Sequence, residues 1–92
     1  MKAAALALMA ALALGQPATY KGAGTVVAVD RDMGRVTIEA EPIEALKLPA
    51  LALAFNVHDQ RVWNRVYRGR YVEFEFIKQG NNYLLLRVLN TN

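Results

Sequence analysis

Two prolines and an alternating apolar run, all within Glu41 to Phe55, restrict the fold of this chain more than any other stretch. Pro42 fits the first position of a helical turn, and Pro49 ends that turn because proline cannot donate the hydrogen bond that a helix interior needs. After Pro49 the apolar residues recur at every second position, as on one face of a strand: Leu51, Leu53, Phe55 and Val57. The stretch therefore predicts a short helical turn followed directly by a half-buried strand.

Four further segments alternate between apolar and polar side chains as strands do. The first, Thr25 to Asp30, is rich in valine, whose branched side chain suits a pleated strand better than a helix. The other three are Arg35 to Glu41, Tyr71 to Lys78 and Tyr83 to Leu89. Glycine-containing hairpin signals lie at Asp30 to Gly34 and at Gln79 to Asn82. Together with Leu51 to Val57, these segments predict five short strands.

One segment between the third and fourth strands has helical spacing instead. Its apolar residues are Val62, Trp63, Val66 and Tyr67, a pattern that predicts a short amphipathic helix covering an opening. A set of five short strands cannot leave flat edges exposed and stay soluble, so the sheet is expected to close on itself. The predicted fold is a small all-β closed barrel with a short helical turn between strands 2 and 3.

The first residues have the composition of an export signal. Lys2 is followed by an uncharged Ala/Leu run, and small residues precede Gln16, where we expect cleavage. The run is shorter than the roughly 20 residues that cross a bilayer, so we expect no stable membrane insertion. We therefore predict an export signal at 1–15, a mobile arm at 16–23 and the barrel domain at 24–92.

Composition argues against several classes of function. The formal net charge of +3 is too small to indicate a nucleic-acid or membrane partner by itself. The chain contains no cysteine and no serine, so the usual side-chain nucleophiles are missing. His58 has only Asp59 beside it, and neighbours on an extended chain point to opposite faces. We expect a monomeric single domain without enzyme activity.

The proline frame also carries a family resemblance. Pro42, Ile43, Pro49 and Phe55 occur in an order that resembles the central segment of the CusF-like periplasmic copper/silver-binding proteins. A Gly-x-Val start at Gly24–Val26 and a late run at Phe74–Asn81 stand in the family's order too, so the resemblance covers roughly residues 22–90. It implies a five-stranded OB-like closed barrel in the periplasm.

The resemblance also implies a metal site, and the positions that match it lack metal donors. In that family a histidine, a tryptophan and two methionines hold Cu(I) or Ag(I), soft ions that prefer such ligands. The matching positions here are Ala40, Leu48, Leu51 and Leu53. Leucine has nearly the volume of methionine but no sulfur, and alanine has no donor at all. We therefore predict no metal or other cofactor, and a copper/silver-family binding protein whose metal binding is weak or absent.

Other potential donors are scattered along the sequence. Met33 and His58 have no spacing that brings them together, so they are interpreted as a loop methionine and a solvated histidine. The carboxylates that could attract a harder cation are Glu39, Glu41 and Glu44, and their outward alternation favours a solvated face. Trp63 fits core packing better than a displaced cap over a metal.

A cluster of arginines suggests two alternative functions: Arg61, Arg65, Arg68 and Arg70 lie close together in sequence, interleaved with aromatic residues. On an OB-like barrel such a cluster can bind single-stranded nucleic acid, although an exported protein meets little of it. The same arginines suit metal-independent docking to an acidic protein surface. By resemblance that partner is a periplasmic component of a metal-efflux pump.

Overall fold

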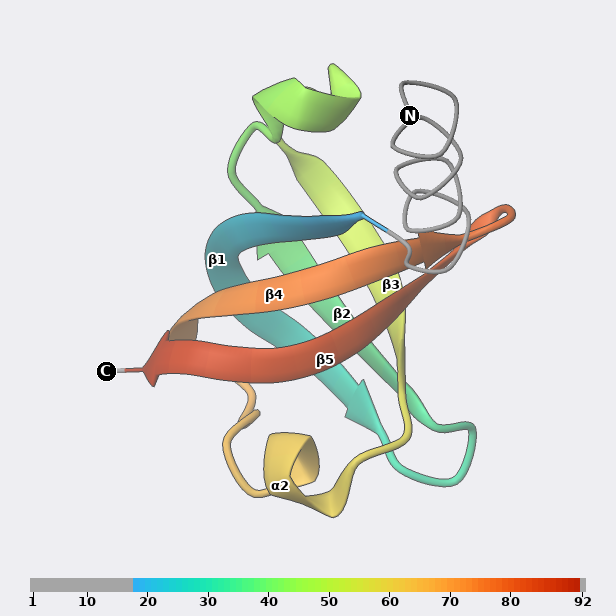
Figure 1. The fold of residues 1–92 in the computed structure, drawn as a ribbon. Helices are drawn as coiled ribbons and strands as arrows, with labels where there is room; N and C mark the ends of the chain where they lie inside the picture. The colour runs from blue at the N-terminus through green and yellow to red at the C-terminus, as the bar shows by residue number, and fades with distance from the viewer. Residues whose placement is uncertain (1–17, 92) are drawn as a thin grey trace, which may run out of the picture.

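The structure, a computed structural model, describes residues 18–91 and consists of strands joined by short loops (Figure 1). The elements in chain order are β1 (Thr19–Asp30), β2 (Arg35–Ala40), the 3-10 turn η1 (Glu44–Leu46), β3 (Leu51–Val57), α2 (Gln60–Trp63), β4 (Tyr71–Gln79) and β5 (Asn82–Thr91). The predicted helical turn between strands 2 and 3 is confirmed. The predicted export signal at 1–15 lies outside the described residues.

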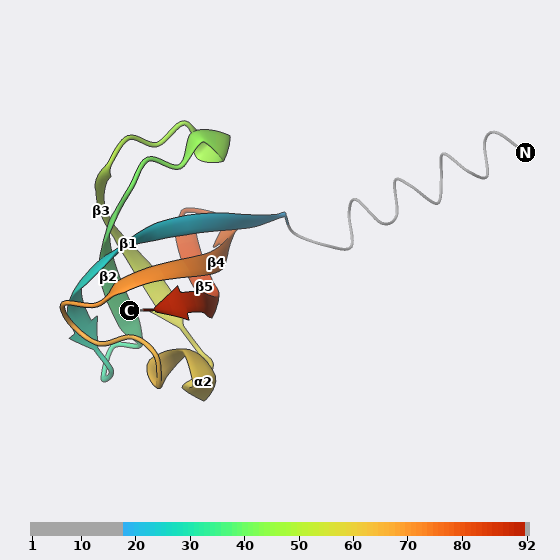
Figure 2. The same ribbon diagram turned by 90° about the vertical axis from the view of Figure 1, so that its left-hand side faces the viewer.

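The five strands form a closed barrel, as the sequence pattern predicted, and their order around it is β1-β2-β3-β5-β4 (Figure 2). All neighbours are antiparallel except β3 and β5, which pair in parallel over a short stretch. β1 is long enough to pair with both β2 and β4, and it changes partner near Gly24, which lies opposite Ala40 on one side and Val72 on the other. This bent strand closes the barrel.

The prediction of a mobile arm at 16–23 is wrong from Thr19 onward, and the barrel begins before residue 24. Residues from Thr19 to Thr25 pair with β4, running from Thr19 opposite Ile77 to Thr25 opposite Tyr71. The backbone ladder holds this segment in place even though its side chains carry no regular apolar alternation. Gln16 and Pro17 lie outside the described residues.

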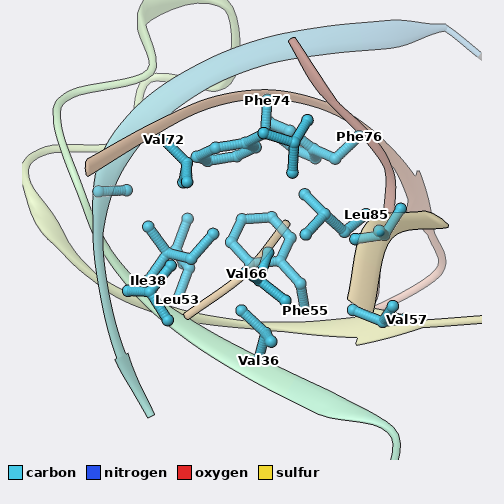
Figure 3. Packing of buried hydrophobic residues seen from close by; sticks show 14 of the residues in the cluster. Val36, Ile38, Leu53, Phe55, Val57, Val66, Val72, Phe74, Phe76 and Leu85 are labelled. Atoms are coloured by element: carbon cyan, nitrogen blue, oxygen red, sulfur yellow. The ribbon is translucent and has the colours of Figure 1, made fainter. Parts of the chain in front are cut away.

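The core fills the barrel with side chains from every strand (Figure 3). The rings of Phe55, Phe74 and Phe76 lie with centroids 5.1 to 5.8 Å apart in tilted or edge-to-face contacts, the arrangement that aromatic pairs prefer. Each of these three side chains is fully buried. Alternate residues of β2 and β4 also point inward and are buried: Val36, Ile38, Ala40, Val72, Phe74 and Phe76.

Two short helical segments, η1 and α2, lie at opposite ends of the molecule (Figures 1 and 2). At one end Val62 and Trp63 of α2 and Val66 just after it join the core, while Tyr67 is 49% exposed and does not belong to the predicted buried stripe. At the other end Ile43, beside η1, is 4% exposed. Within residues 18–91 no helix is long and apolar enough to span a membrane.

Candidate functional site

Three of the four positions that match the family's metal ligands meet at the η1 end of the barrel. Ala40, the last residue of β2, lies directly opposite Leu51, and Ile38 lies opposite Leu53. Because strand side chains alternate between faces, Leu51 and Leu53 project to the same side of β3. The strand pairing therefore brings Ala40, Leu51 and Leu53 together.

The fourth position is set by the loop that contains η1. The N–H of Ile43 donates to the carbonyl of Leu48 over 2.9 Å, and the N–H of Leu48 donates back over 3.1 Å. Between them Lys47 takes a left-handed conformation with φ 55°, which turns the chain back toward the barrel. Leu48 is held in this closed loop and packs against the core.

These four side chains are all apolar and lie at the border of the hydrophobic core. Ala40 and Leu53 are 3% and 8% exposed, Leu48 is half-buried, and only Leu51, at 36%, is open to solvent. A hydrocarbon side chain offers no lone pair to Cu(I) or Ag(I), so this set fits neither ion. The volume-conserving leucines instead extend the apolar packing to the end of the barrel.

The oxygen donors near this end also form no closed cation site. An open depression of about 550 Å³ lies outside Leu51, with Glu39 and Glu41 in its lining. Both carboxylates and that of Glu44 are exposed, consistent with the solvated face that the sequence favoured. No group of three or more His, Cys, Asp or Glu in residues 18–91 could hold a metal ion.

One hydrogen bond ties this end of the barrel to β4. The Tyr71 hydroxyl donates to Glu41 Oε2 over 2.8 Å. The bond to the Glu41 carboxylate, together with partial desolvation and the negative charges of Glu41 and Glu73, raises the pKa of Tyr71 above its ordinary value. This bond links Glu41, the residue after β2, to the first residue of β4.

This shift predicts a pH-dependent contribution of Tyr71 to stability. Because its pKa is higher in the folded state, the contribution is complete below the unfolded value of about 10 and is lost as pH rises through the folded value. We expect the stability difference between the parent and Tyr71→Phe to shrink above pH 10 in urea unfolding at a series of pH values. In the control variant Glu41→Gln, tyrosinate absorbance is expected to appear at lower pH, because the main cause of the raised pKa of Tyr71 is removed. A difference that stays constant with pH would contradict the prediction.

The other soft donors lie away from the η1 end. Met33 is 65% exposed in the turn between β1 and β2, and His58 is exposed just after β3. Trp63 lies at the α2 end, 8% exposed, where Arg31 packs over its ring at 5.2 Å and donates to its carbonyl. Trp63 is therefore a core residue and does not cover the η1 end.

The four predicted docking arginines divide into two groups. Arg61 pairs with Asp59 over 2.9 Å and holds the pKa of that carboxyl below its usual range, while Arg65 donates to the carbonyl of Val88. The other two follow in the loop before β4, where Arg70 lies 5.7 Å from the centre of the Tyr67 ring. The tertiary structure adds Arg87 of β5 to the first group, a neighbour that sequence distance concealed.

A closed five-stranded barrel with a helical segment after its third strand defines a small OB-like binding domain. The family model described as copper-binding periplasmic protein CusF matches residues 19–90 of this chain. The chain therefore belongs to the CusF family. The description names binding rather than a reaction, in agreement with the absence of a predicted catalytic motif.

Known relatives and structures agree with this assignment. The protein named cation efflux system protein CusF is 33% identical over 70 residues in Escherichia coli O6:H1 and 31% in Escherichia coli K12. Each match covers 76% of this chain and 64% of the relative's length.

Two solved structures extend the comparison. The structure of CusF–Ag(I) from Escherichia coli aligns with a TM-score of 0.73 at 30% identity, covering 79% of this chain and 91% of that one. The C-terminal domain of SilB from Cupriavidus metallidurans aligns with a TM-score of 0.67 at 17% identity, covering 77% and 85%, which supports the fold alone.

Proposed function

We propose that this protein is a periplasmic, CusF-like binding module that does not hold Cu(I) or Ag(I) tightly at the position its family uses. The observation that carries the proposal is the donor chemistry at the η1 end. Ala40, Leu51 and Leu53 come together there, with Leu48 beside the core, and none of the four has a nitrogen, oxygen or sulfur in its side chain. The soft ions need such donors.

A silver titration tests this directly. The chain from Gln16 onward is titrated with Ag(I) against a competing chelator, beside Escherichia coli CusF, whose Ag(I) complex has been solved. We expect the relative to compete for the ion and this protein to leave it with the chelator. A dissociation constant of about 1 nM or below for this protein would overturn the proposal.

The function that remains without tight metal binding is interaction with another protein. The relatives are named as parts of a cation efflux system, and we propose a component of such a system as the partner. The support is a surface with several exposed arginines around α2 and the following loop, which suits an acidic partner surface. The expected export signal would take the chain to the compartment where such components lie.

A pull-down from periplasmic extract tests this second part. The immobilised protein is expected to retain an efflux component at low salt and to release it as salt rises, because exposed charges are screened. Recovery of no efflux component under any salt condition would count against the partner. The result is independent of the silver titration.

A further inference from the structure

The outer edge of β5 has a strand partner over only part of its length. β5 pairs with β4 throughout, but with β3 only at Leu84 and Leu85. Beyond Leu85, no other strand of residues 18–91 lies along this edge. The segment after α2 lies there instead, and Arg65 Nη1 donates to the carbonyl of Val88 over 2.8 Å. A backbone acceptor of this edge is therefore within reach of a donor from outside the sheet.

A depression of about 310 Å³ lies between this edge and α2. Its lining combines three arginines, three aliphatic side chains and one carboxylate: Arg61, Arg65, Arg87, Val62, Leu86, Val88 and Asp59. Val62 and Val88 are almost fully buried, at 2% and 6% exposed, and Leu86 is half-buried; these three aliphatic residues form the apolar floor beneath the charged rim. The volume is at the small end of the range for ligand clefts, enough for a few side chains of a bound segment.

The arginines around this floor can accept additional carboxylates. Arg61 pairs with Asp59 and Arg87 pairs with Glu75, and the two arginine side chains are 90% and 66% exposed. Because both guanidinium groups are open to solvent and each carries five N–H donors, a partner's carboxylate can bind them beside Asp59 and Glu75. Arg65 takes part in neither pair, and its bond to Val88 uses only part of a guanidinium that carries five N–H donors.

We propose that this depression binds an extended acidic segment of a partner protein. The carboxylates of the segment pair with Arg65 and Arg87, an aliphatic side chain covers the apolar floor, and the segment lies in the depression between β5 and α2. No aromatic side chain lines the depression to stack a base, which favours a peptide over single-stranded nucleic acid. The inference rests on the proposed function as an interaction module and specifies the chemistry of its partner.

The site lies at the α2 end of the barrel, and the positions that match the family's metal ligands lie at the η1 end (Figure 1). Binding of an acidic segment therefore does not require metal. A tight silver complex would overturn the proposed loss of metal binding but would not bear on peptide binding in the depression. Failure of the depression to bind an acidic peptide would overturn this inference but would not bear on the silver titration.

The experiment measures binding of a fluorescently labelled peptide of alternating Glu and Val to the full chain. We expect fluorescence anisotropy to show binding, and amide signals from Leu86 to Asn90 to shift in the NMR spectrum. Arg65→Gln/Arg87→Gln is expected to weaken binding about tenfold or more, as the loss of a charge-assisted pair on each side implies. The single variant Arg87→Gln keeps the bond between Arg65 and Val88, so its peptide affinity tests the depression even if the double variant is less stable.

The matched control is Arg68→Gln/Arg70→Gln, which removes the same charge from arginines that do not line the depression. Its affinity is expected to stay near that of the parent. Equal weakening in both double variants would overturn the inference in favour of nonspecific attraction. Equal binding of a Lys/Val peptide, or tighter binding of a single-stranded oligonucleotide with the same amide shifts, would overturn it as well.

Discussion

Restoring the four family residues is expected to create tight silver binding. In Ala40→His/Leu48→Trp/Leu51→Met/Leu53→Met, the imidazole stands beside two thioethers, because residue 40 lies opposite residue 51 on the neighbouring strand. We expect the affinity for Ag(I) to rise by about a thousandfold or more, on the order of 4 kcal/mol. Chelator competition with parent and variant side by side measures this gain.

The strand geometry indicates that the barrel can accommodate these changes. Leu→Met is close to volume-conserving and usually costs less than about 1.5 kcal/mol. Leu51 is already 36% exposed, and Leu48 lies in a loop rather than within the sheet, so the larger groups at these positions have space toward solvent. Ala40 is the tightest position, at 3% exposed. Far-ultraviolet circular dichroism should therefore match the parent before affinity is compared.

A control variant with two methionines on another strand shows whether any gain in Ag(I) affinity needs the arrangement of the four restored residues or only additional sulfur atoms. Leu84→Met/Leu86→Met places two thioethers at the same spacing on β5, away from Ala40. We expect no gain in Ag(I) affinity from this pair, and a partial gain from Leu51→Met/Leu53→Met alone. If the fully restored variant binds no better than the parent, the assignment of these positions to the family's ligands is wrong.

The fold was predictable wherever side chains alternate over a buried face. The prolines at 42 and 49 located the helical turn, and the predicted strand Leu51 to Val57 has the same bounds in the structure. The start of β1 was missed because Gly22 and Gly24 have no side chain to alternate. That segment is a strand because β4 pairs with its backbone, a tertiary contact that the local sequence does not encode.

The strand positions that meet at the η1 end were easier to predict than the side-chain surroundings at the α2 end. Adjacent antiparallel strands explain why Ala40 and Leu51 meet, which the alternation already indicated. The burial of Tyr67 was predicted from a helical period, but α2 ends at Trp63 and the period does not continue to residue 67. Arg87 joins Arg65 only through the way β5 passes α2, a long-range arrangement without a local signal.

Gly24→Ala is expected to be strongly destabilising, although it adds a single methyl group. A β-carbon at this position would lie 2.3 Å from the carbonyl oxygen of Glu39 and 2.8 Å from the Cα of Ala40. Both atoms belong to the backbone of β2, so no rotation of a side chain can relieve the contact. We expect a loss of about 3 kcal/mol or more in the free energy of unfolding, at the upper end of overpacking effects, measured by urea denaturation.

Two other glycines provide graded controls for this effect. Gly80→Ala meets no atom within 4 Å, so it carries only the cost of its φ of 61°, about 1–2 kcal/mol. Gly22→Ala would place its β-carbon 2.8 Å from the ring of Phe74, which is buried and can yield only partly, so we expect an intermediate loss. A Gly24→Ala variant as stable as Gly80→Ala would contradict the close approach of β1 to β2. That approach also fixes Ala40 opposite Leu51, so any relaxation around a β-carbon at residue 24 must displace the η1 end itself.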